Sequence, residues 1–291
     1  MANGKLGIIG GSGLYDLPDL QIDDRLLLET PFGPPSDRLI VGHLGSTDVV
    51  FLPRHGAGHR LTPSELPYRA NIYALKQLGV THLLTVSAVG SVREELPPLT
   101  IVLPDQIIDR TVARPRTFFE GGAVAHVGLA HPFCPCLSGE IARAAATTGI
   151  PIVEGGTYLC IEGPQFSTRA ESMLYRSWDA AVIGMTAMPE ARLAREAELC
   201  YATIAMVTDY DVWHETEGPV TVEMVVANLR ANTEAAKRIV RAVADQGLPD
   251  RTCACGDALR DAIVTAPDAI TPETRRRLGV IAERYLGAPV P

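Results

Sequence analysis

The sequence predicts an α/β fold, a single domain in which helices flank a mixed sheet. Short runs rich in Val, Ile and Leu, such as KLGIIG at 5–10 and CYATIAM at 200–206, alternate with segments of helical periodicity at 68–78 and 188–199. Near-continuous apolar strands between amphipathic helices are typical of a sheet buried on both faces. With 291 residues, 46% of them hydrophobic, the chain is long enough to bury one large core.

The elements follow one another in a regular order. We expect strands at 5–10, 38–44, 48–56, 81–90, 100–108, 155–166, 180–186 and 200–211. We expect helices at 68–78, 137–149, 169–178 and 188–199, and a long helix that Thr221 caps and that ends near Gln246. The sequence predicts a domain over 1–250 and, after the segment LPDRTCACG at 248–256, a helical extension over 251–291 packed on the same domain.

Charge and hydropathy favour a small-molecule partner. The net charge of -8 argues against nucleic-acid binding, which needs many Lys and Arg side chains facing phosphates. No segment reaches about 18 uninterrupted apolar residues, so we expect no membrane span. The N-terminal stretch has too short an apolar run for a signal peptide, and we therefore expect a cytoplasmic protein.

The six cysteines do not form a recognisable metal motif in the sequence. Cys160 and Cys200 lie in apolar runs, where cysteine behaves as a small core residue. The pairs CPC at 134–136 and CAC at 253–255 are spaced more tightly than the usual zinc pairs, and we expect no metal site. Whether Cys134, Cys136, Cys253 and Cys255 form disulfides stays open.

Several strands run directly into residues that suit an anion. In α/β sheets, ligands bind beyond the carboxyl ends of the strands. The turn GGSG at 10–13 offers backbone N–H groups and a hydroxyl, although a plain tight turn is an alternative. Arg54 and His55 form a charged pair after an apolar strand, which predicts a phosphate fork or, alternatively, an Arg54 paired with a buried acid. The candidate phosphate-binding residues are Ser12, Arg54, His55, Ser87, Ala88 and Thr186.

Two carboxylates mark the end of the strand at 200–211. Asp209 and Asp211 lie on the same side if the strand persists through Tyr210, because side chains two apart point the same way. They could bind a metal or cap a helix, but the neighbouring aromatic residues favour a nitrogen-rich ligand such as a purine. One carboxylate would accept hydrogen bonds and the other, if burial keeps it protonated, would donate one.

Over residues 5–245 the chain resembles the trimeric purine nucleoside phosphorylases. The resemblance rests on GIIGGSGLYD, RHG, VSAVGSVREE, DQIIDRT, HPFCP, IEGPQFSTRAES, GMTAMPEARLAREAELCYA and TDYDVW, and it implies that family's fold. It implies phosphate binding at the six positions above, ribose packing on Met185 and purine binding near Phe166. It also implies a homotrimer or a dimer of trimers, in which His59 and a neighbouring subunit's His126 cover the 5' end of the nucleoside.

The resemblance implies phosphorolysis of 5'-deoxy-5'-methylthioadenosine to adenine and 5-methylthioribose 1-phosphate, with phosphate as co-substrate and no cofactor. Asp209 would protonate N7, Asp211 would bind the amino edge, and His55 would act with Arg54 on phosphate. Ser167 and Val222 match positions that select adenine and an alkylthio group. Alternatives are another 5'-modified nucleoside, such as a 5'-deoxy- or 5'-halo-5'-deoxyadenosine or methylthioinosine, and a hydrolase. Gly184 departs from the Asn of the animal enzymes, which removes one side-chain hydrogen bond near the site.

Overall fold

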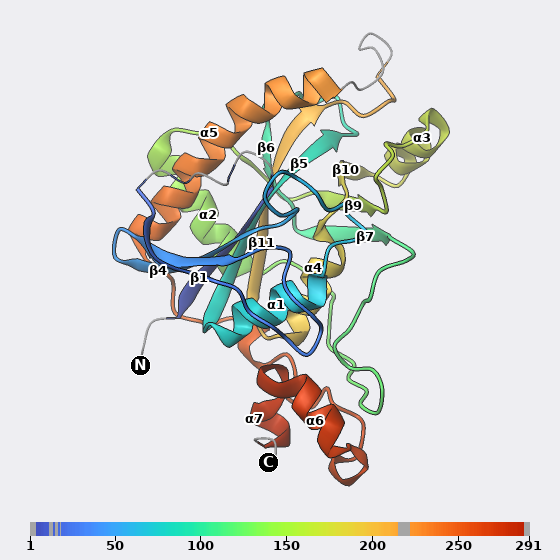
Figure 1. Cartoon of the computed structure of the whole chain (residues 1–291). Helices are drawn as coiled ribbons and strands as arrows, with labels where there is room; N and C mark the ends of the chain where they lie inside the picture. Colours follow the sequence, from blue (N-terminus) through green and yellow to red (C-terminus); the bar gives the residue numbers. More distant parts are fainter. Residues whose placement is uncertain (1–3, 12–13, 15–16, 18, 215–221, 288–291) are drawn as a thin grey trace.

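The computed structural model describes residues 4–11, 14, 17, 19–214 and 222–287, and, within the last range, the side chains from 226 onward. Its centre is an eleven-stranded sheet (Figure 1). The strands are β1 (Lys5–Gly10), β2 (Gln21–Leu26), β3 (Leu39–Leu44), β4 (Thr47–Pro53), β5 (Val80–Ser91), β6 (Ile101–Leu103), β7 (Gln106–Arg110), β8 (Val153–Glu154), β9 (Thr157–Ile161), β10 (Ala180–Gly184) and β11 (Cys200–Asp209).

The sheet is mixed, as the sequence predicted. Strand β1 is parallel to β4 and β5, and β11 is parallel to β5 on its other edge. Strands β2, β3 and β4 form an antiparallel meander. The end of β5 pairs antiparallel with β10, which runs parallel to β9, as β9 does to β7. The twelve-residue strand β5 therefore joins every part of the sheet that later forms the cavity.

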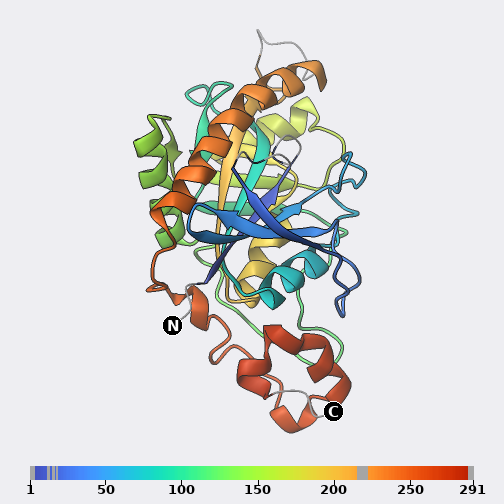
Figure 2. The ribbon, with the colours of Figure 1, turned by 60° about the vertical axis from the view of Figure 1, so that its left-hand side comes forward.

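Helices cover both faces of the sheet (Figures 1 and 2). Helices α1 (Tyr68–Gln77) and α4 (Ala187–Glu196) pack on one face, and α2 (Pro135–Thr148) and α5 (Val222–Gln246) on the other. The side chains of β4 alternate between the two cores: Val50 and Leu52 pack with α1 and α4, whereas Val49 and Phe51 pack with α2 and α5. This two-residue alternation is the pleat of a strand buried on both sides. Helix α3 (Arg169–Ser177) packs beside β10.

Some predicted boundaries were wrong. The strand expected at 100–108 is divided into β6 and β7 at Pro104, whose ring removes a backbone donor, and the two halves pair with different strands, β11 and β9. The strand expected at 155–166 ends at Ile161. Strand β2 was not expected, because its sequence QIDDRL is polar; it lies exposed at the edge of the sheet. Thr221, the expected helix cap, lies outside the described residues.

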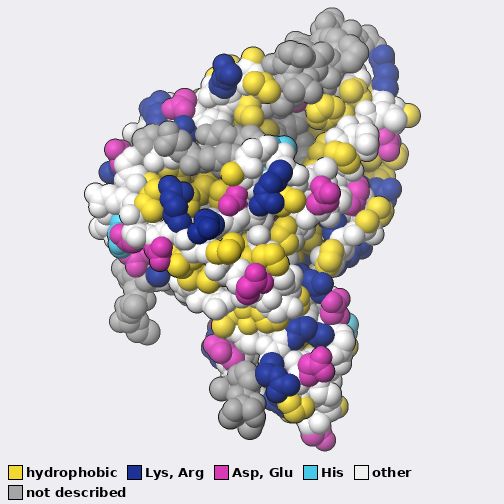
Figure 3. Space-filling view, viewed as in Figure 1, with side chains coloured by type: hydrophobic (Ala, Val, Ile, Leu, Met, Phe, Trp, Pro, Cys, Tyr) yellow, Lys and Arg dark blue, Asp and Glu magenta, His cyan; other side chains and the backbone are white. Residues whose placement is uncertain are grey.

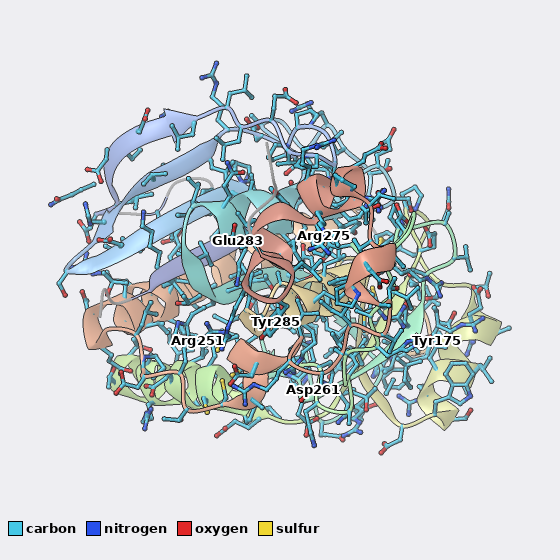
Figure 4. All side chains as sticks on the ribbon, turned by 90° about the horizontal axis from the view of Figure 1, so that it is seen from below. Tyr175, Arg251, Asp261, Arg275, Glu283 and Tyr285 are labelled. Atoms are coloured by element: carbon cyan, nitrogen blue, oxygen red, sulfur yellow. The ribbon has the colours of Figure 1, made fainter. Side chains whose placement is uncertain are left out.

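The segment from Arg251 onward lies below the sheet in Figure 1 and is seen end-on in Figure 4, which labels Arg251 and Tyr285. It contains α6 (Pro272–Leu278) and α7 (Glu283–Leu286). Leu278 and Ile281 belong to the same apolar core as α1, and the Tyr285 hydroxyl donates a 2.6 Å hydrogen bond to Oε1 of Glu198. The proposed division of the chain at residue 250 stays a prediction.

No helix among the described residues has both the length and the apolar character needed to cross a bilayer. On the face drawn in Figure 3, Lys and Arg side chains are interspersed with Asp and Glu.

Glu196, at the end of α4, holds the loop that follows β7. Its carboxylate accepts 2.7 Å hydrogen bonds from the Thr117 hydroxyl and the Phe118 N–H, and it is only 5% exposed. We predict that Glu196→Ala destabilises the fold by roughly 1–3 kcal/mol, because it leaves a buried donor unpaired. Thermal unfolding should show Tm lower by about 2–4 °C per kcal/mol.

A matched control is Glu234→Ala on the exposed face of α5, where the carboxylate pairs with Lys237 in the same helix. Such surface pairs contribute about 0.5 kcal/mol or less, so its Tm should stay close to that of the parent protein. Equal Tm values for the two variants would contradict the role of Glu196.

Candidate functional site

A cavity of ≈ 300 Å³ lies where the strand ends meet. It is lined from the ends of β1, β4, β10 and β11, from the last third of β5, and from α5 through Leu229 and Thr233. The expected convergence of five strands on one ligand site is therefore present. One difference is that β5 does not end at the site: it runs on through Ser87 and Ala88 to Ser91.

Arg54 is buried at the bottom of this cavity and is held by the protein. Its Nε donates a 2.7 Å hydrogen bond to Oε1 of Glu190, and its Nη1 donates to the Val86 carbonyl oxygen at 2.8 Å. Burial by itself lowers the pKa of Arg54, but Glu190 more than offsets this and the pKa is raised. The sequence left open whether Arg54 pairs with a buried acid, and it does. Its Nη2 also donates, at 3.4 Å each, to the Ile9 carbonyl oxygen and to Oε2 of Glu190, so one of the five N–H groups of the guanidinium, on Nη1, is left for a ligand.

His55 lies next to Arg54 in a neutral state. Its Nδ1 is 2.9 Å from the carbonyl oxygen of Leu61, which can only accept, so Nδ1 carries the proton. Burial and, after it, the charge of Arg54 lower the pKa of His55 to about 4. The His59 ring stacks on it with centroids 4.3 Å apart. The positive charge therefore resides on Arg54, and Nε2 of His55 is left as an acceptor.

Hydroxyl groups complete this part of the cavity. Oγ of Ser87 lies 3.3 Å from Oγ1 of Thr186 and 3.2 Å from the hydroxyl of Tyr158. Thr186 immediately precedes α4 without using its side chain as a cap. Ala88 lines the cavity with them. These residues, with Arg54, form what we call the hydroxyl end of the cavity.

The structure explains why residue 184 is a glycine. A Cβ atom there would lie 1.9 Å from the hydroxyl oxygen of Tyr158, so no side chain fits while Tyr158 occupies the space. The hydroxyl of Tyr158, on the neighbouring strand β9, contacts Ser87 instead. The sequence did not indicate Tyr158, because the interaction depends on the register between β9 and β10.

Asp209 and Asp211 both line the cavity, although not in the way we expected. The strand does not persist through Tyr210: β11 ends at Asp209, and Asp211 has a positive φ of 53°, a conformation that Asp tolerates better than most residues. Oδ1 of Asp209 accepts the Asp211 N–H at 2.9 Å, and Oδ2 accepts the Thr208 hydroxyl at 2.7 Å. A tight turn therefore brings the two carboxylates together.

The surroundings of both acids favour the protonated form. Burial raises the pKa of Asp209, against the hydrogen bonds from Thr208 and Asp211. Burial, with a smaller contribution from the nearby carboxylate of Asp209, raises the pKa of Asp211 to about 6, against the effect of the Ser172 hydroxyl. Helix α5 supports the turn, because the Asn228 and Asn232 amides donate to the carbonyl oxygens of Thr208 and Val207 at 2.6 and 2.8 Å.

The acids lie at a defined spacing from the hydroxyl end. Asp209 pairs with Gly90, three residues along β5 from Ser87, which corresponds to about 10 Å in a strand. A Cβ on Gly90 would be 2.9 Å from Oδ1 of Asp209, so glycine lets the carboxylate approach the strand. Between and around these groups the lining is apolar and includes Met185 and Phe166.

Two buried oxygens that line the cavity have no hydrogen bond of good geometry within the described part of the chain. They are Oγ of Ser167 and Oδ2 of Asp211. Leaving a buried polar atom unpaired costs free energy, and in native proteins such atoms call for an explanation. A ligand with polar edges would satisfy both.

Three expected residues are not placed in the cavity. Ser12 lies outside the described residues, as does the side chain of Val222 at the start of α5. His126 does not line the cavity of its own chain; its N–H donates to the Ala262 carbonyl oxygen at 2.8 Å, in the region near the C-terminal segment. The remaining candidates, including His59, all line it. Sequence reasoning missed Glu190, Tyr158, Thr208 and the two Asn residues of α5.

Comparison with known proteins identifies the family of the chain. Residues 5–245 match the family described as the Phosphorylase superfamily. The chain is 54% identical over 286 residues to the S-methyl-5'-thioadenosine phosphorylase of Gloeobacter violaceus, covering 97% of this chain and 96% of the relative.

Two solved structures are similar over most of their length. A methylthioadenosine phosphorylase from an antarctic soil metagenomic library has a TM-score of 0.90 and 48% identity, with 97% of this chain and 99% of that chain covered. The methylthioadenosine phosphorylase from Schistosoma mansoni in complex with adenine has a TM-score of 0.86 and 38% identity, with 91% and 100% covered. The fold expected from the sequence motifs is confirmed, and the chain belongs to the phosphorylase superfamily.

Proposed function

We propose that this chain catalyses the phosphorolysis of 5'-deoxy-5'-methylthioadenosine, giving adenine and 5-methylthioribose 1-phosphate. The observation that carries the proposal is that one cavity is lined by two different groups of side chains. Arg54 and the neighbouring hydroxyl groups lie at one end, and two buried carboxylates lie about 10 Å away along β5. The names of the relatives and of the similar structures support the same substrate.

The hydroxyl end binds phosphate in this proposal. Arg54 supplies the positive charge, held in place by Glu190, while Ser87 and Thr186 donate hydrogen bonds and the backbone at Ala88 allows close approach. Nε2 of neutral His55 accepts a hydrogen bond from a protonated phosphate oxygen. This favours hydrogen phosphate over fully ionised phosphate. Ser12 would add a further hydroxyl. Inorganic phosphate is a co-substrate, and we propose that no cofactor takes part.

The reaction breaks one bond and forms one. A phosphate oxygen bonds to C1' as the bond from C1' to N9 of the purine breaks, and the ribose carbon carries positive charge in the transition state. Phosphate held by Arg54 stabilises that charge, and Asp209 delivers a proton to N7 so that adenine leaves neutral. Asp211 accepts a hydrogen bond from the 6-amino group through Oδ2, which has no partner of good geometry among the described residues.

The 5' end of the substrate is assigned by chemistry and by the resemblance. The ribose packs on Met185 and the purine lies near Phe166 and Ser167. An apolar Val222 disfavours a free 5'-hydroxyl, because it cannot hydrogen-bond it. His59 covers the 5' group, together with His126 of a neighbouring subunit.

A homotrimer, or a dimer of trimers, is part of this proposal. Exposed apolar side chains at Val112, Met173, Leu174 and Trp178 support a subunit contact near α3. A molar mass from light scattering of three or six times the 31.2 kDa chain tests it. The cytoplasm stays the expected location.

The first experiment measures adenine release from 5'-methylthioadenosine with and without phosphate. We expect release that depends strictly on phosphate, with methylthioadenosine used faster than adenosine, inosine or 5'-chloro-5'-deoxyadenosine. Adenine release without phosphate would make the protein a hydrolase and leave Arg54 a structural role. A faster halogenated or inosine substrate would keep the reaction and overturn the assignment of the 5' substituent or the base.

Asp209→Asn tests the proton donor. An amide cannot supply the proton for N7, so we expect kcat to fall by roughly 10²–10⁴ while the fold is retained. Asp245→Asn is the control, since that carboxylate is exposed and pairs with Arg241 on the surface of α5. A loss of less than about tenfold for Asp209→Asn would remove it from the mechanism.

We predict that kcat/KM depends on pH through the carboxyl group of Asp211, and that Asp211→Asn abolishes this dependence. Its carboxyl takes up a proton as the pH falls through about 6, and the neutral carboxyl then accepts a hydrogen bond from the amino group more weakly than the carboxylate does. We therefore expect kcat/KM of the parent protein to fall below pH 6 more steeply than that of the variant. Ionisation of phosphate affects both proteins equally, so the ratio of their kcat/KM values reports the titration of Asp211.

The same group predicts a change in stability. Its pKa is higher in the folded protein than the ordinary 3.9 of an unfolded chain, so the proton stabilises the fold below pH 4 and this stabilisation is lost as pH rises through 6. Asp211→Asn should raise the free energy of unfolding at pH 8 by roughly 1–3 kcal/mol and give little gain at pH 4. If the ratio of kcat/KM between the parent protein and Asp211→Asn does not change with pH, and if the two proteins have the same Tm, the role assigned to Asp211 is contradicted.

A further inference from the structure

Four cysteines from three separate parts of the chain meet away from the cavity. The sulfur atoms of Cys134, Cys200, Cys253 and Cys255 all lie within 4.8 Å of one another. We call them the four-thiol cluster. Sγ of Cys253 is 3.6 Å from Sγ of Cys134 and 3.4 Å from Sγ of Cys200. None of the six cysteines is in a disulfide, and all members of the cluster except Cys253 are at most 3% exposed.

The spacing of these sulfurs suits one tetrahedral ion. Zinc binds thiolate sulfur at about 2.3 Å, which places the four sulfurs of a tetrahedral site about 3.8 Å apart. The two Sγ to Sγ distances of 3.6 and 3.4 Å are close to this value. Four thiolates and no carboxylate or water position form the ligand set of a closed, structural zinc site rather than a catalytic one.

Tertiary structure changes the meaning of the cysteine spacing. We expected no metal because CPC and CAC are too tight for two ordinary zinc pairs. In the fold, however, Cys134 is the N-cap of α2 and Cys200 begins β11, and the two are neighbours because the Cys134 N–H donates to the Tyr201 carbonyl oxygen at 2.7 Å. The turn at Ala254–Asp257 brings both cysteines of CAC to them, and Cys136 stays outside the cluster.

The surroundings supply positive charge and N–H donors. Four thiolates around a divalent ion leave two negative charges, which require compensation in a buried place. Nη1 of Arg195 lies 3.5 Å from Sγ of Cys255, and the Leu137 N–H donates to Sγ of Cys134 at 3.5 Å. Arg251, labelled in Figure 4 at the start of the C-terminal segment, donates to the Glu198 carbonyl oxygen close by.

We propose that the four-thiol cluster binds one zinc ion. The ion links the first turn of α2, the first residue of β11 and the start of the C-terminal segment, and it thereby fastens residues 251–287 to the sheet. This proposal is independent of the reaction proposed above, since none of its ligands lines the cavity.

The test measures metal content of the full chain, purified without chelator. We expect about one zinc ion per chain by elemental analysis, and its loss in Cys253→Ser. Cys136→Ser is the matched control, because Cys136 belongs to the same CPC motif but lies outside the cluster; it should keep the ion. Zinc that persists in Cys253→Ser, or is lost in Cys136→Ser, would overturn the assignment of ligands.

Thiol counting separates zinc from disulfides. In the zinc form, denatured but unreduced protein should show six reactive thiols per chain, since all six cysteines are then free. Two reactive thiols would show two disulfides in place of the ion and overturn the proposal.

Cobalt substitution keeps the test valid if Cys253→Ser fails to fold. Adding Co²⁺ to the metal-depleted parent protein should produce the intense visible absorption of tetrahedral cobalt thiolate and raise Tm. If the thiols are reduced and Co²⁺ produces neither the absorption nor the rise in Tm, the proposal is overturned.

Discussion

The ion pair between Arg54 and Glu190 is the interaction on which the site depends. Both side chains are 1% exposed, and their charges would be costly to bury separately. Arg54 also donates to carbonyl oxygens of β5 and β1, and the Tyr201 hydroxyl of β11 donates to Glu190 at 3.3 Å. The guanidinium thus joins β1, β5 and α4 to the end of β4, and Glu190 adds β11. The guanidinium lines the cavity in a fixed orientation with one N–H of Nη1 left over, and a fixed orientation is what binding an anion with precision requires.

Burial affects the two aspartates differently from Arg54 and Glu190. Their charged forms are not neutralised by a neighbouring cation; burial instead raises both pKa values. Such an arrangement lowers stability at neutral pH, and proteins retain it where a proton must be held or moved. Arg54 is kept charged, whereas both aspartates hold a proton more readily than an exposed aspartate does, within one cavity. This contrast divides the site into an anion end and a base end, and β5 sets the distance between them.

The sequence motifs predicted the site better than they predicted its geometry. Strand ends such as PRHG and TDYD are local signals, because an apolar run followed by charged residues is readable in one segment. Glu190 and Tyr158 carry no such signal: one is an ordinary helical Glu, the other a strand Tyr, and each matters only through a partner more than 70 residues away. The turn at Asp211 was wrongly expected to be strand, since only packing against Gly90 and α5 fixes its φ.

The sequence by itself determined the fold class, most of the strands and helices, and most of the residues of the cavity, because hydrophobic periodicity and side-chain chemistry act over a few residues. Tertiary structure alone decided that Arg54 is held by Glu190, that Tyr158 fills the space beside Gly184, and that cysteines 134, 200, 253 and 255 share one place. These depend on strand register and on contacts between distant segments. No local pattern encodes such contacts, because their free energy arises only once the sheet and its helices have packed.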